Sequence, residues 1–464
     1  MTRWPAEWEK RMRRLLGAEY PAFAAQMGRP PVRGVRVNPL RCDARRFAAL
    51  AEENLPGVTL RPVPFAPEGF AAEGMLSGRH PWHHAGVFYL QEPSAMAAVT
   101  AAGIAPGMRV LDLCAAPGGK STQAAGALMG RGFLLSNEVM PGRTAALLSN
   151  LERLGVRNAA VTCERPDRLC AALEGGFDVV LVDAPCSGEG LFRREPAAAR
   201  EWGPGLPEAC ARRQTLILQS ARRAVRPGGV LVYSTCTFAP EENEGVVDAF
   251  LQENPDFYIE EIPAAFGRPA MPEWAGAAPG VARARRILPQ DGGEGHFVAR
   301  LRRAGDDPCR VKPAPVPPPA GEAFEAFCRE VIPAGVAGIP CRVGDEVFLL
   351  PESPLPDMRG MRLLRAGVPA GTLRRTGRGA ERFEPAHGLF MAAGGPAPAV
   401  VCDLPAGSGE LAAWLHGEEI PAPAGVPAGF AAVRAGGFPV GFGKISGGRI
   451  KNHYPKGLRN LGPG

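Results

Sequence analysis

The sequence is poor in the features that mark secreted, membrane and zinc-binding proteins. Its 11 cysteines are odd in number, follow no regular spacing and include no CxxC pair. This argues against a disulfide framework and a structural zinc site, so we expect reduced thiols, no metal and a cytoplasmic protein. No uncharged apolar stretch of about 18 residues occurs, so we expect no membrane span. The N-terminus carries Glu7, Glu9 and Glu19 among its arginines and lacks the apolar segment of a signal peptide.

Acidic residues are missing from the last 45 residues, after Glu419. Six cations lie in that tail: Arg434, Lys444, Arg449, Lys451, Lys456 and Arg459. The whole chain has 53 basic and 47 acidic residues, so the tail carries the entire net charge of +6. A concentrated basic end favours docking to a polyanion, and the alternative is a solvated surface that keeps the protein soluble.

Segments typical of strands and of helices alternate between about residues 104 and 303. The expected strands are 108–113, 132–137, 159–163, 178–183 and 229–235, and the expected helices are 119–130, 141–154, 166–174, 206–226 and 241–253. This alternation predicts a doubly wound α/β domain, in which helices cover a parallel sheet. Substrates bind to such domains outside the carboxyl ends of the strands, where Asp112, Glu138, Asp183, Cys186 and Cys236 all fall.

The composition along the chain predicts a division into five parts. We expect a small N-terminal α+β domain over 1–95, beginning with an amphipathic helix, and the doubly wound domain over 96–304. A stiff linker is expected over 305–320, because its prolines favour an extended chain. Two small domains, α+β or all β, are expected over 321–392 and 395–464, and the second carries the basic tail.

A glycine-rich turn from Asp112 to Lys120 closes one expected strand and opens a helix. Glycines let the backbone approach a ligand closely, with the N-terminus of the helix behind it. Glu138 follows at the end of the next strand, where a carboxylate can bind ribose hydroxyls, so the turn suits an adenosine-containing cofactor. A phosphate-binding P-loop would need glycine at position 114, which is a cysteine, and the remaining alternative is a tight turn with a solvated lysine.

Cys186 and Cys236 differ from the other cysteines, which we interpret as small buried side chains, because both follow strand ends of the expected sheet. Two thiols beside an adenosyl cofactor suit methylation of carbon 5 of a pyrimidine, which becomes reactive when a thiolate adds to carbon 6. Lys120 is a nearby cation that could activate a thiol. Asp183 could hydrogen-bond the base in the way that distinguishes cytosine, and the base must leave its stack to reach such a site.

At these motifs the chain resembles the Sun-type (Fmu) RNA cytosine-5 methyltransferases. The matching segments are 89–96, 112–120, 183–188 and 234–237. The segment 441–457 is similar to the C-terminal domain of the subgroup called ribosomal RNA small-subunit methyltransferase F.

The resemblance implies a Rossmann-like methyltransferase domain, S-adenosylmethionine as the cofactor and a monomer that binds RNA. It assigns the attack on carbon 6 to Cys236, the release of product to Cys186, and a place near the target base to Asp183. The positions expected to contact the cofactor are Cys114, Ala115, Ala116, Pro117, Gly118, Gly119, Lys120, Glu138 and Asp183. After the third strand Glu164 is the candidate for a further cofactor contact, although ungapped spacing favours Arg165.

The resemblance also implies that the domain over 1–95 binds RNA and that 395–464 forms a PUA-like RNA-binding domain. Its expected RNA contacts are Lys444, Arg449, Lys451, His453, Tyr454, Lys456 and Arg459. The substrate expected first is 16S ribosomal RNA, with tRNA as the alternative. Two other classes stay open: a P-loop nucleotide hydrolase, and a non-catalytic RNA-binding assembly factor, which would need neither Cys186 nor Cys236.

Overall fold

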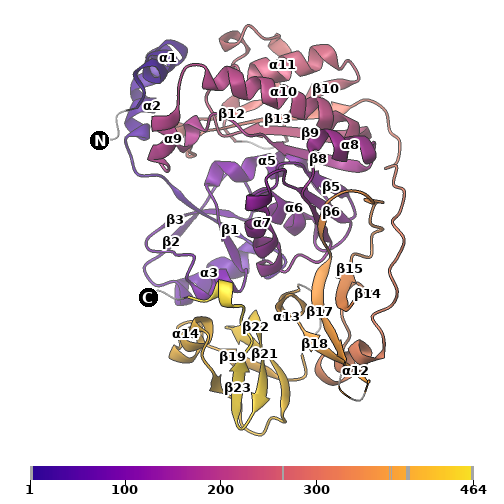
Figure 1. The fold of residues 1–464 in the computed structure, drawn as a ribbon. Helices are drawn as coiled ribbons and strands as arrows, with labels where there is room; N and C mark the ends of the chain where they lie inside the picture. Colours follow the sequence, from indigo (N-terminus) through magenta and orange to yellow (C-terminus); the bar gives the residue numbers. More distant parts are fainter. Residues whose placement is uncertain (1–3, 264–265, 376, 378, 393–397, 461–464) are drawn as a thin grey trace.

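The computed structural model describes residues 4–263, 266–375, 377, 379–392 and 398–460. A large mixed sheet occupies the upper part of the molecule in Figure 1, with a small N-terminal sheet and two C-terminal sheets below it. Within these described residues, no helix combines the length and the apolar character needed to cross a membrane.

The large sheet has the strand order β11-β12-β13-β9-β8-β5-β6-β7-β16, and β10 pairs with β13. Its parallel centre consists of β5 (Arg109–Asp112), β6 (Phe133–Asn137), β7 (Ala159–Thr162), β8 (Phe177–Asp183) and β9 (Val225–Thr235). The antiparallel part consists of β10 (Phe257–Glu260), β11 (Arg268–Pro269), β12 (Arg285–Ile287) and β13 (His296–Arg303). All five strands expected from the sequence are therefore confirmed.

Helices cover both faces of this sheet, as the sequence predicts. They are α5 (Ala97–Ala102), α6 (Gly119–Leu128), α7 (Pro141–Arg153), α8 (Pro166–Ala172), α9 (Pro196–Glu201), α10 (Leu206–Ala224) and α11 (Glu244–Glu253). Alternate strand residues enter separate cores: Leu111 and Leu231 pack with Leu218 of α10, whereas Val110 and Val232 pack with Leu147 of α7. Because both faces are buried, the strands are almost entirely apolar and were easy to find from the sequence.

The last strand of the large sheet comes from the C-terminal half of the chain. Strand β16 (Leu363–Ala366) pairs with β7, with Leu363 opposite Thr162 and Ala366 opposite Ala160. The segment expected as a small domain over 321–392 thus forms a sheet of its own and also adds one strand to the large sheet. The physical reason is that β7 would otherwise leave an edge of unpaired backbone groups.

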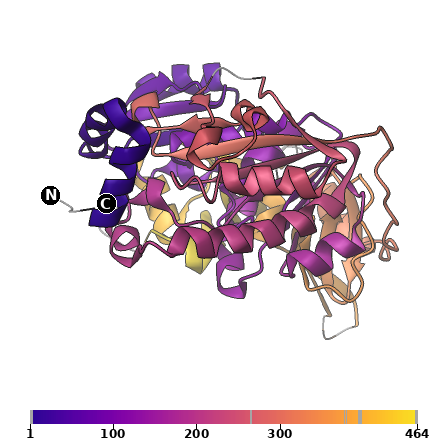
Figure 2. The same cartoon turned by 90° about the horizontal axis from the view of Figure 1, so that it is seen from above.

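The described part of the N-terminal segment, residues 4–95, consists of a helical hairpin and a small sheet. Strands β1 (Arg33–Val37), β2 (Thr59–Pro62), β3 (Gly69–Glu73) and β4 (Phe88–Leu90) make a sheet, and α3 (Ala44–Asn54) and α4 (Pro81–His84) accompany it. Helices α1 (Ala6–Leu16) and α2 (Tyr20–Met27) instead lie at one end of the molecule (Figure 2). There Trp8 packs against Phe192 and Phe238 of the methyltransferase domain, with ring centroids 5.3 and 6.3 Å away.

Two small sheets follow the proline-rich linker, which runs as an extended chain along the right side of Figure 1. The first consists of β14 (Ile339–Val343), β15 (Glu346–Leu350), β17 (Val368–Arg375) and β18 (Glu381–Pro385), with α12 (Glu322–Val331) and α13 (His387–Met391). The second consists of β19 (Val401–Leu404), β20 (Ile420–Pro421), β21 (Gly429–Ala435), β22 (Phe438–Ser446) and β23 (Arg449–Asn452), with α14 (Gly409–His416).

The second C-terminal sheet shares a hydrophobic core with the N-terminal sheet. Trp82 of α4 packs against Phe438 of β22 at a centroid distance of 5.9 Å, and Phe47 and Trp414 belong to the same core. The basic tail is therefore attached firmly to the N-terminal domain.

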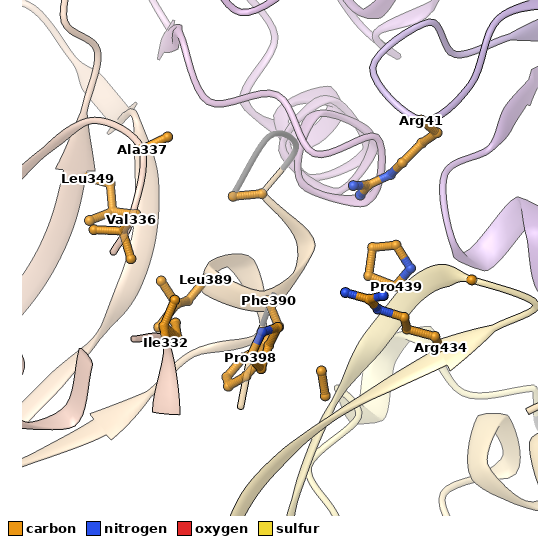
Figure 3. A pocket seen from close by; sticks show the side chains of 13 residues that line it. Arg41, Ile332, Val336, Ala337, Leu349, Leu389, Phe390, Pro398, Arg434 and Pro439 are labelled. Carbon is orange, nitrogen blue, oxygen red and sulfur yellow. The ribbon is translucent and has the colours of Figure 1, made fainter. Parts of the chain in front are cut away.

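A cavity of about 170 Å³ lies where the N-terminal domain meets both C-terminal sheets (Figure 3). The guanidinium groups of Arg41 and Arg434 enter it from opposite sides, and Ile332, Leu389 and Phe390 form an apolar wall. Arg41 also donates hydrogen bonds to the carbonyl oxygens of Ala85, at 3.2 Å, and Met391, at 2.6 Å. Because these carbonyls belong to different domains, Arg41 links the N-terminal domain to α13.

Candidate active site

The glycine-rich loop between β5 and α6 lies at the carboxyl edge of the large sheet. Gly118 has a φ of +110°, which favours glycine, and a Cβ atom there would lie 3.3 Å from the side chain of Leu147. Side chains of α7 hold the loop from outside: Arg143 donates to the carbonyl of Ala116 at 2.8 Å, and Asn150 to that of Pro117 at 2.9 Å. The loop is thus fixed with its backbone close to the edge of the sheet.

Two residues of this loop region carry polar groups into the site. Asp112 is buried and accepts a hydrogen bond from Ser121 at 2.7 Å through one oxygen, whereas its Oδ1 has no hydrogen-bond partner within the part of the chain that the structure describes. Burial raises the pKa of Asp112 to about 6. Burial also raises the pKa of Cys114 well above its ordinary value, so this cysteine remains a neutral thiol.

Two carboxylates lie at the ends of the next strands. Glu138 is buried after β6, accepts from the backbone N–H of Met140 at 2.9 Å, and has Arg143 3.4 Å away. Glu164 is buried after β7 and accepts from the backbone N–H of Arg165 at 3.0 Å. The side chain of Arg165 is 73% exposed and pairs with Asp167, so its position is less suited to a cofactor contact than that of Glu164.

Asn137, which the sequence reasoning missed, joins three of these strand ends. Its side-chain oxygen accepts from the backbone N–H of Glu164 at 3.0 Å and from the hydroxyl of Thr162 at 2.9 Å. Its amide donates to the carbonyl of Leu113 at 3.3 Å. A polar residue at the end of an otherwise apolar strand, directly before Glu138, was the available signal.

Lys120 and Asp183 form an ion pair at the centre of the site. The Nζ atom of Lys120 lies 2.8 Å from Oδ2 of Asp183, and the other carboxylate oxygen of Asp183 accepts from the hydroxyl of Ser234 at 2.9 Å. Burial would lower the pKa of Lys120, but the charge of Asp183 and, more weakly, that of Cys236 raise it above its ordinary value. Lys120 is therefore a permanent cation beside Cys236.

The two cysteines that follow β8 and β9 lie next to each other. Their sulfur atoms are 3.2 Å apart, and the backbone N–H of Cys236 donates to the sulfur of Cys186 at 3.4 Å. Both side chains are partly exposed. The hydrogen bond with Cys236, followed by burial, raises the pKa of the Cys186 thiol well above its ordinary value. Cys186 is thus a protonated donor beside Cys236.

A buried carboxylate behind the cysteines connects the two strand ends, and the sequence reasoning missed it. Glu242 accepts from the backbone N–H of Ser187 at 2.9 Å, from its hydroxyl, and from the amide of Gln214 at 2.8 Å. The hydroxyl of Ser187 also lies 2.7 Å from that of Thr237. Burial raises the pKa of Glu242 to about 7. Because Ser187 follows Cys186 and Thr237 follows Cys236, this network fixes the position of one thiol relative to the other.

The residues expected to bind RNA are divided between surface and core. Lys444 and Lys451 lie directly opposite each other on β22 and β23, and Lys451, His453 and Lys456 are exposed. Arg449 lies 3.5 Å from Glu419. These positions are compatible with the expected docking surface.

Tyr454 is placed differently from that expectation, whereas Arg459 is partly exposed. Tyr454 is only 3% exposed and its hydroxyl lies 2.7 Å from Nδ1 of His84, so it belongs to the core shared with the N-terminal domain. Arg459 donates to the carbonyl of Tyr454 at 3.5 Å. A pattern of cations and one aromatic residue could not distinguish a surface aromatic from a core one.

Among the residues described here, no group of three or more His, Cys, Asp and Glu side chains is arranged to hold a metal ion. The carboxyl edge of the large sheet brings together an ion pair, two thiols, a glycine-rich loop and two strand-end carboxylates. All of the catalytic candidates from the sequence, namely Lys120, Asp183, Cys186 and Cys236, lie at this edge of the sheet.

Comparisons with known proteins identify related domains along the chain. Residues 101–302 match the model of the family described as 16S rRNA methyltransferase RsmB/F. Residues 4–93 match the N-terminal domain of 16S rRNA methyltransferase RsmF, 326–392 its first C-terminal domain, and 403–460 its PUA domain.

Similar proteins span almost the whole chain. The ribosomal RNA small subunit methyltransferase F of Erwinia tasmaniensis is 34% identical over 98% of this chain and 96% of its own length. That of Cronobacter sakazakii is 34% identical over 94% of this chain and 92% of its own length. A crystal structure of a methyltransferase homolog from Pyrococcus horikoshii, 30% identical, has a TM-score of 0.57 over 65% of this chain and 96% of that one.

The matches confirm the family and the Rossmann-like fold expected from the motifs, and they favour a methyltransferase over a P-loop hydrolase. Three of the four matched models are described as domains of RsmF, and together the four cover most of the chain. The chain therefore belongs to the RsmB/F family of 16S rRNA methyltransferases, with the domain set of its F members.

Proposed function

We propose that this methyltransferase uses S-adenosylmethionine to methylate carbon 5 of a cytosine in RNA, with 16S ribosomal RNA as the substrate. The reaction passes through a covalent bond between Cys236 and carbon 6 of the base. The observation that carries the proposal is the 3.2 Å distance between two partly exposed thiols beside the Lys120–Asp183 ion pair. One thiol is enough for a simple nucleophile, so a pair indicates separate roles in attack and release.

The residues around the glycine-rich loop fit the cofactor. Glu138 and Glu164 present carboxylates that can accept hydrogen bonds from hydroxyl and amine groups, and the backbone of Gly118 and Gly119 can be approached closely. The unpartnered Oδ1 of Asp112, considered within the described residues, is a further buried acceptor at this edge. When bound, S-adenosylmethionine supplies an electrophilic methyl group, and its sulfur keeps the electron pair of the broken bond.

Cys236 acts first, as a thiolate held near the Lys120 ammonium group. Its sulfur forms a bond to carbon 6, and the electron pair of the carbon 5–carbon 6 double bond becomes available for the new bond at carbon 5. Asp183 accepts a hydrogen bond from the exocyclic amine of cytosine, a contact that uracil cannot make. Lys120 holds this carboxylate in place at 2.8 Å.

Release restores the aromatic ring. A base removes the proton from carbon 5, the carbon–hydrogen pair re-forms the double bond, and the carbon–sulfur bond breaks so that the sulfur of Cys236 leaves as a thiolate. Cys186 assists this step because its raised pKa keeps it protonated, and its S–H group can donate to the departing sulfur 3.2 Å away. Without that donor the covalent adduct lives longer.

RNA as the substrate is supported by the surface of the second C-terminal sheet. Like charges directly opposite on neighbouring strands repel each other, and Lys444 and Lys451 are such a pair. A polyanion relieves this repulsion, and no acidic residue follows Glu419 in the sequence. The relatives named above supply the choice of small-subunit ribosomal RNA.

The test uses labelled S-adenosylmethionine, 16S ribosomal RNA and three single substitutions. Cys236→Ser is expected to abolish methylation, and Cys186→Ala, which removes the donor, to accumulate a protein–RNA adduct that survives a denaturing gel. Cys328→Ser is the matched control, because Cys328 is also partly exposed but lies on α12. Equal methylation by the wild type and by both active-site variants would refute the mechanism.

A further inference from the structure

A second pocket, with a volume of about 370 Å³, lies between the N-terminal sheet and Arg194 of the methyltransferase domain. Its lining includes the partly exposed Leu90, the exposed Ser77, and two arginines, Arg33 and Arg194, while Val35 and Leu76 lie buried beneath it. The volume falls in the range of about 300–1,000 Å³ that small-molecule sites occupy. It has room for one nucleotide unit.

The arginines of this pocket differ in their partners. Arg194 donates to the carbonyl of Val32, and its Nε lies 3.8 Å from the buried carboxylate of Glu294, which also accepts from the backbone N–H of Val32 at 2.9 Å. Arg33 is exposed and has no ion-pair or side-chain hydrogen-bond partner within the described ranges of the chain. The pocket is therefore held rigidly on one side and presents a cation that no internal carboxylate neutralises.

Hydrogen bonds connect the lining of the pocket to two parts of the active site, the loop after β9 that carries Cys236 and the glycine-rich loop. Arg194 closely follows η3 (Glu189–Leu191), in which the backbone N–H of Gly190 donates to the carbonyl of Cys236 at 2.9 Å. On the other side, Arg36 donates both to the side chain of Gln91 and to the carbonyl of Gly119, the residue before Lys120. These contacts join the lining of the pocket to the loops that carry Cys236 and Lys120.

The pocket also lies toward the basic tail. The loop that carries Leu76 continues to Arg79, whose carbonyl accepts from the amide of Asn460 at 3.2 Å. His84, at the end of α4, contacts both Tyr454 and Asn460, at 2.7 and 3.1 Å. The segment between these two residues carries the exposed Lys456. An RNA strand that runs from this tail to Cys236 would therefore pass over the pocket.

We propose that this pocket binds the nucleotide next to the target cytosine, an inference that rests on RNA being the substrate. The base packs against Leu90, and the hydroxyl of Ser77 contacts its polar edge. Arg33 neutralises the adjoining phosphate. Proteins recognise unstacked RNA bases in this way, through apolar contact with the base together with cations for the backbone. When the target base is flipped out, the adjacent base loses a stacking contact. Packing in the pocket would replace that contact.

The first test compares Arg33→Glu, Arg33→Lys and the wild type in steady-state methylation of 16S ribosomal RNA at several salt concentrations. Arg33→Glu is expected to raise the KM for RNA about 10-fold and to reduce the slope of log affinity against log salt by about 1. The value of kcat at saturating RNA stays within about twofold, because Arg33 touches no reacting atom. Arg33→Lys keeps the charge and stays close to the wild type.

The matched control is Arg223→Glu. Arg223 is also an exposed arginine, but it lies at the end of α10, where β9 begins, at the opposite edge of the sheet from the cysteines. Its KM and salt slope are expected to equal those of the wild type. Equal values for Arg33→Glu and Arg223→Glu, with an active wild-type enzyme, would overturn the pocket assignment. An inactive wild-type enzyme would instead overturn the proposed function.

A second measurement locates the base. RNA that contains 4-thiouridine in place of uridine is crosslinked by light to the wild-type protein, and the attached peptides are identified by mass spectrometry. Crosslinks to peptides that contain Leu76 or Leu90 are expected, and Arg33→Glu should reduce their yield. Crosslinks confined to the C-terminal sheets would refute the proposal.

Discussion

The sulfur atoms of Cys186 and Cys236 lie 3.2 Å apart, and a buried network that includes Glu242 fixes the chain on both sides of them. This closeness follows from topology, because β8 and β9 are adjacent parallel strands and each cysteine follows a strand end. The pair can therefore exchange a hydrogen bond without any rearrangement of the chain. It also makes the site sensitive to oxidants.

Mild oxidation is expected to join the two thiols. Hydrogen peroxide would oxidise both sulfurs to one disulfide, with the two thiol protons and the peroxide oxygens leaving as two molecules of water. Activity should fall, two thiols should become resistant to iodoacetamide, and dithiothreitol should restore both. The Cys186→Ser variant cannot form the disulfide between positions 186 and 236. After the same treatment, Cys236 in this variant should therefore still react with iodoacetamide. Retention of both free thiols in the oxidised wild type would contradict the prediction.

Replacement of Glu242 by glutamine is expected to change how stability depends on pH. Burial raises the pKa of Glu242 from the ordinary value of 4.5 to about 7, so between these values the folded state holds a proton that the unfolded state has lost. Glu242 thus lowers stability as pH rises from about 4.5 to about 7, by up to about 3 kcal/mol.

The measurement is the free energy of unfolding of the wild type minus that of Glu242→Gln, taken from denaturant curves between pH 5 and pH 8. This difference should fall as pH rises and become constant above about pH 7. A difference that is independent of pH would mean that Glu242 does not titrate in this window. Contributions from other groups, such as Asp112, cancel in the comparison.

Loss of the Lys120 charge is expected to slow the chemical step. Lys120→Met removes the cation beside Cys236 and leaves the Asp183 carboxylate without its ion-pair partner. We expect the single-turnover rate of methylation to fall by about 100-fold or more, as for other charged groups that stabilise a transition state. Lys120→Arg keeps a cation and should recover part of the rate. A single-turnover rate equal to that of the wild type in Lys120→Met would rule out this electrostatic role.

Arg41 is expected to matter for stability rather than for chemistry. Its guanidinium group donates to Ala85 and Met391, which belong to different domains, and it faces the cavity of Figure 3. Arg41→Ala should lower the free energy of unfolding by about 2–3 kcal/mol, because charged hydrogen bonds between buried groups are lost. Thermal unfolding checks this, with Arg45→Ala on the exposed part of α3 as the control. An unchanged unfolding temperature for Arg41→Ala would argue against the link.

The sequence was a good guide wherever one short segment carried the signal. Strands β5 to β9 were found because a sheet covered on both faces needs apolar residues throughout. The meeting of Lys120, Asp183, Cys186 and Cys236 was expected because the carboxyl ends of neighbouring parallel strands lie together.

Contacts between distant segments were missed because no local pattern encodes them. The residues of β16 are typical of a strand, but they do not indicate that the strand pairs with β7. The spacing of Trp8 and Met12 indicates one apolar face of a helix. It does not indicate that this face packs against Phe192 and Phe238. Tyr454 looked like a surface aromatic among cations, and its burial depends on His84, which is 370 positions away in the chain.

The pairing of β16 with β7 has a consequence for how a target is chosen. The chain leaves the large sheet at β13, passes through the proline-rich linker and returns to the same sheet as β16, while the last sheet is packed on the N-terminal domain. The C-terminal half of the chain is therefore packed on the rest of the protein at two places, the edge of the large sheet and the N-terminal core. If RNA docks on the basic tail as proposed, the target base would be selected by its distance in the folded RNA from that docking site.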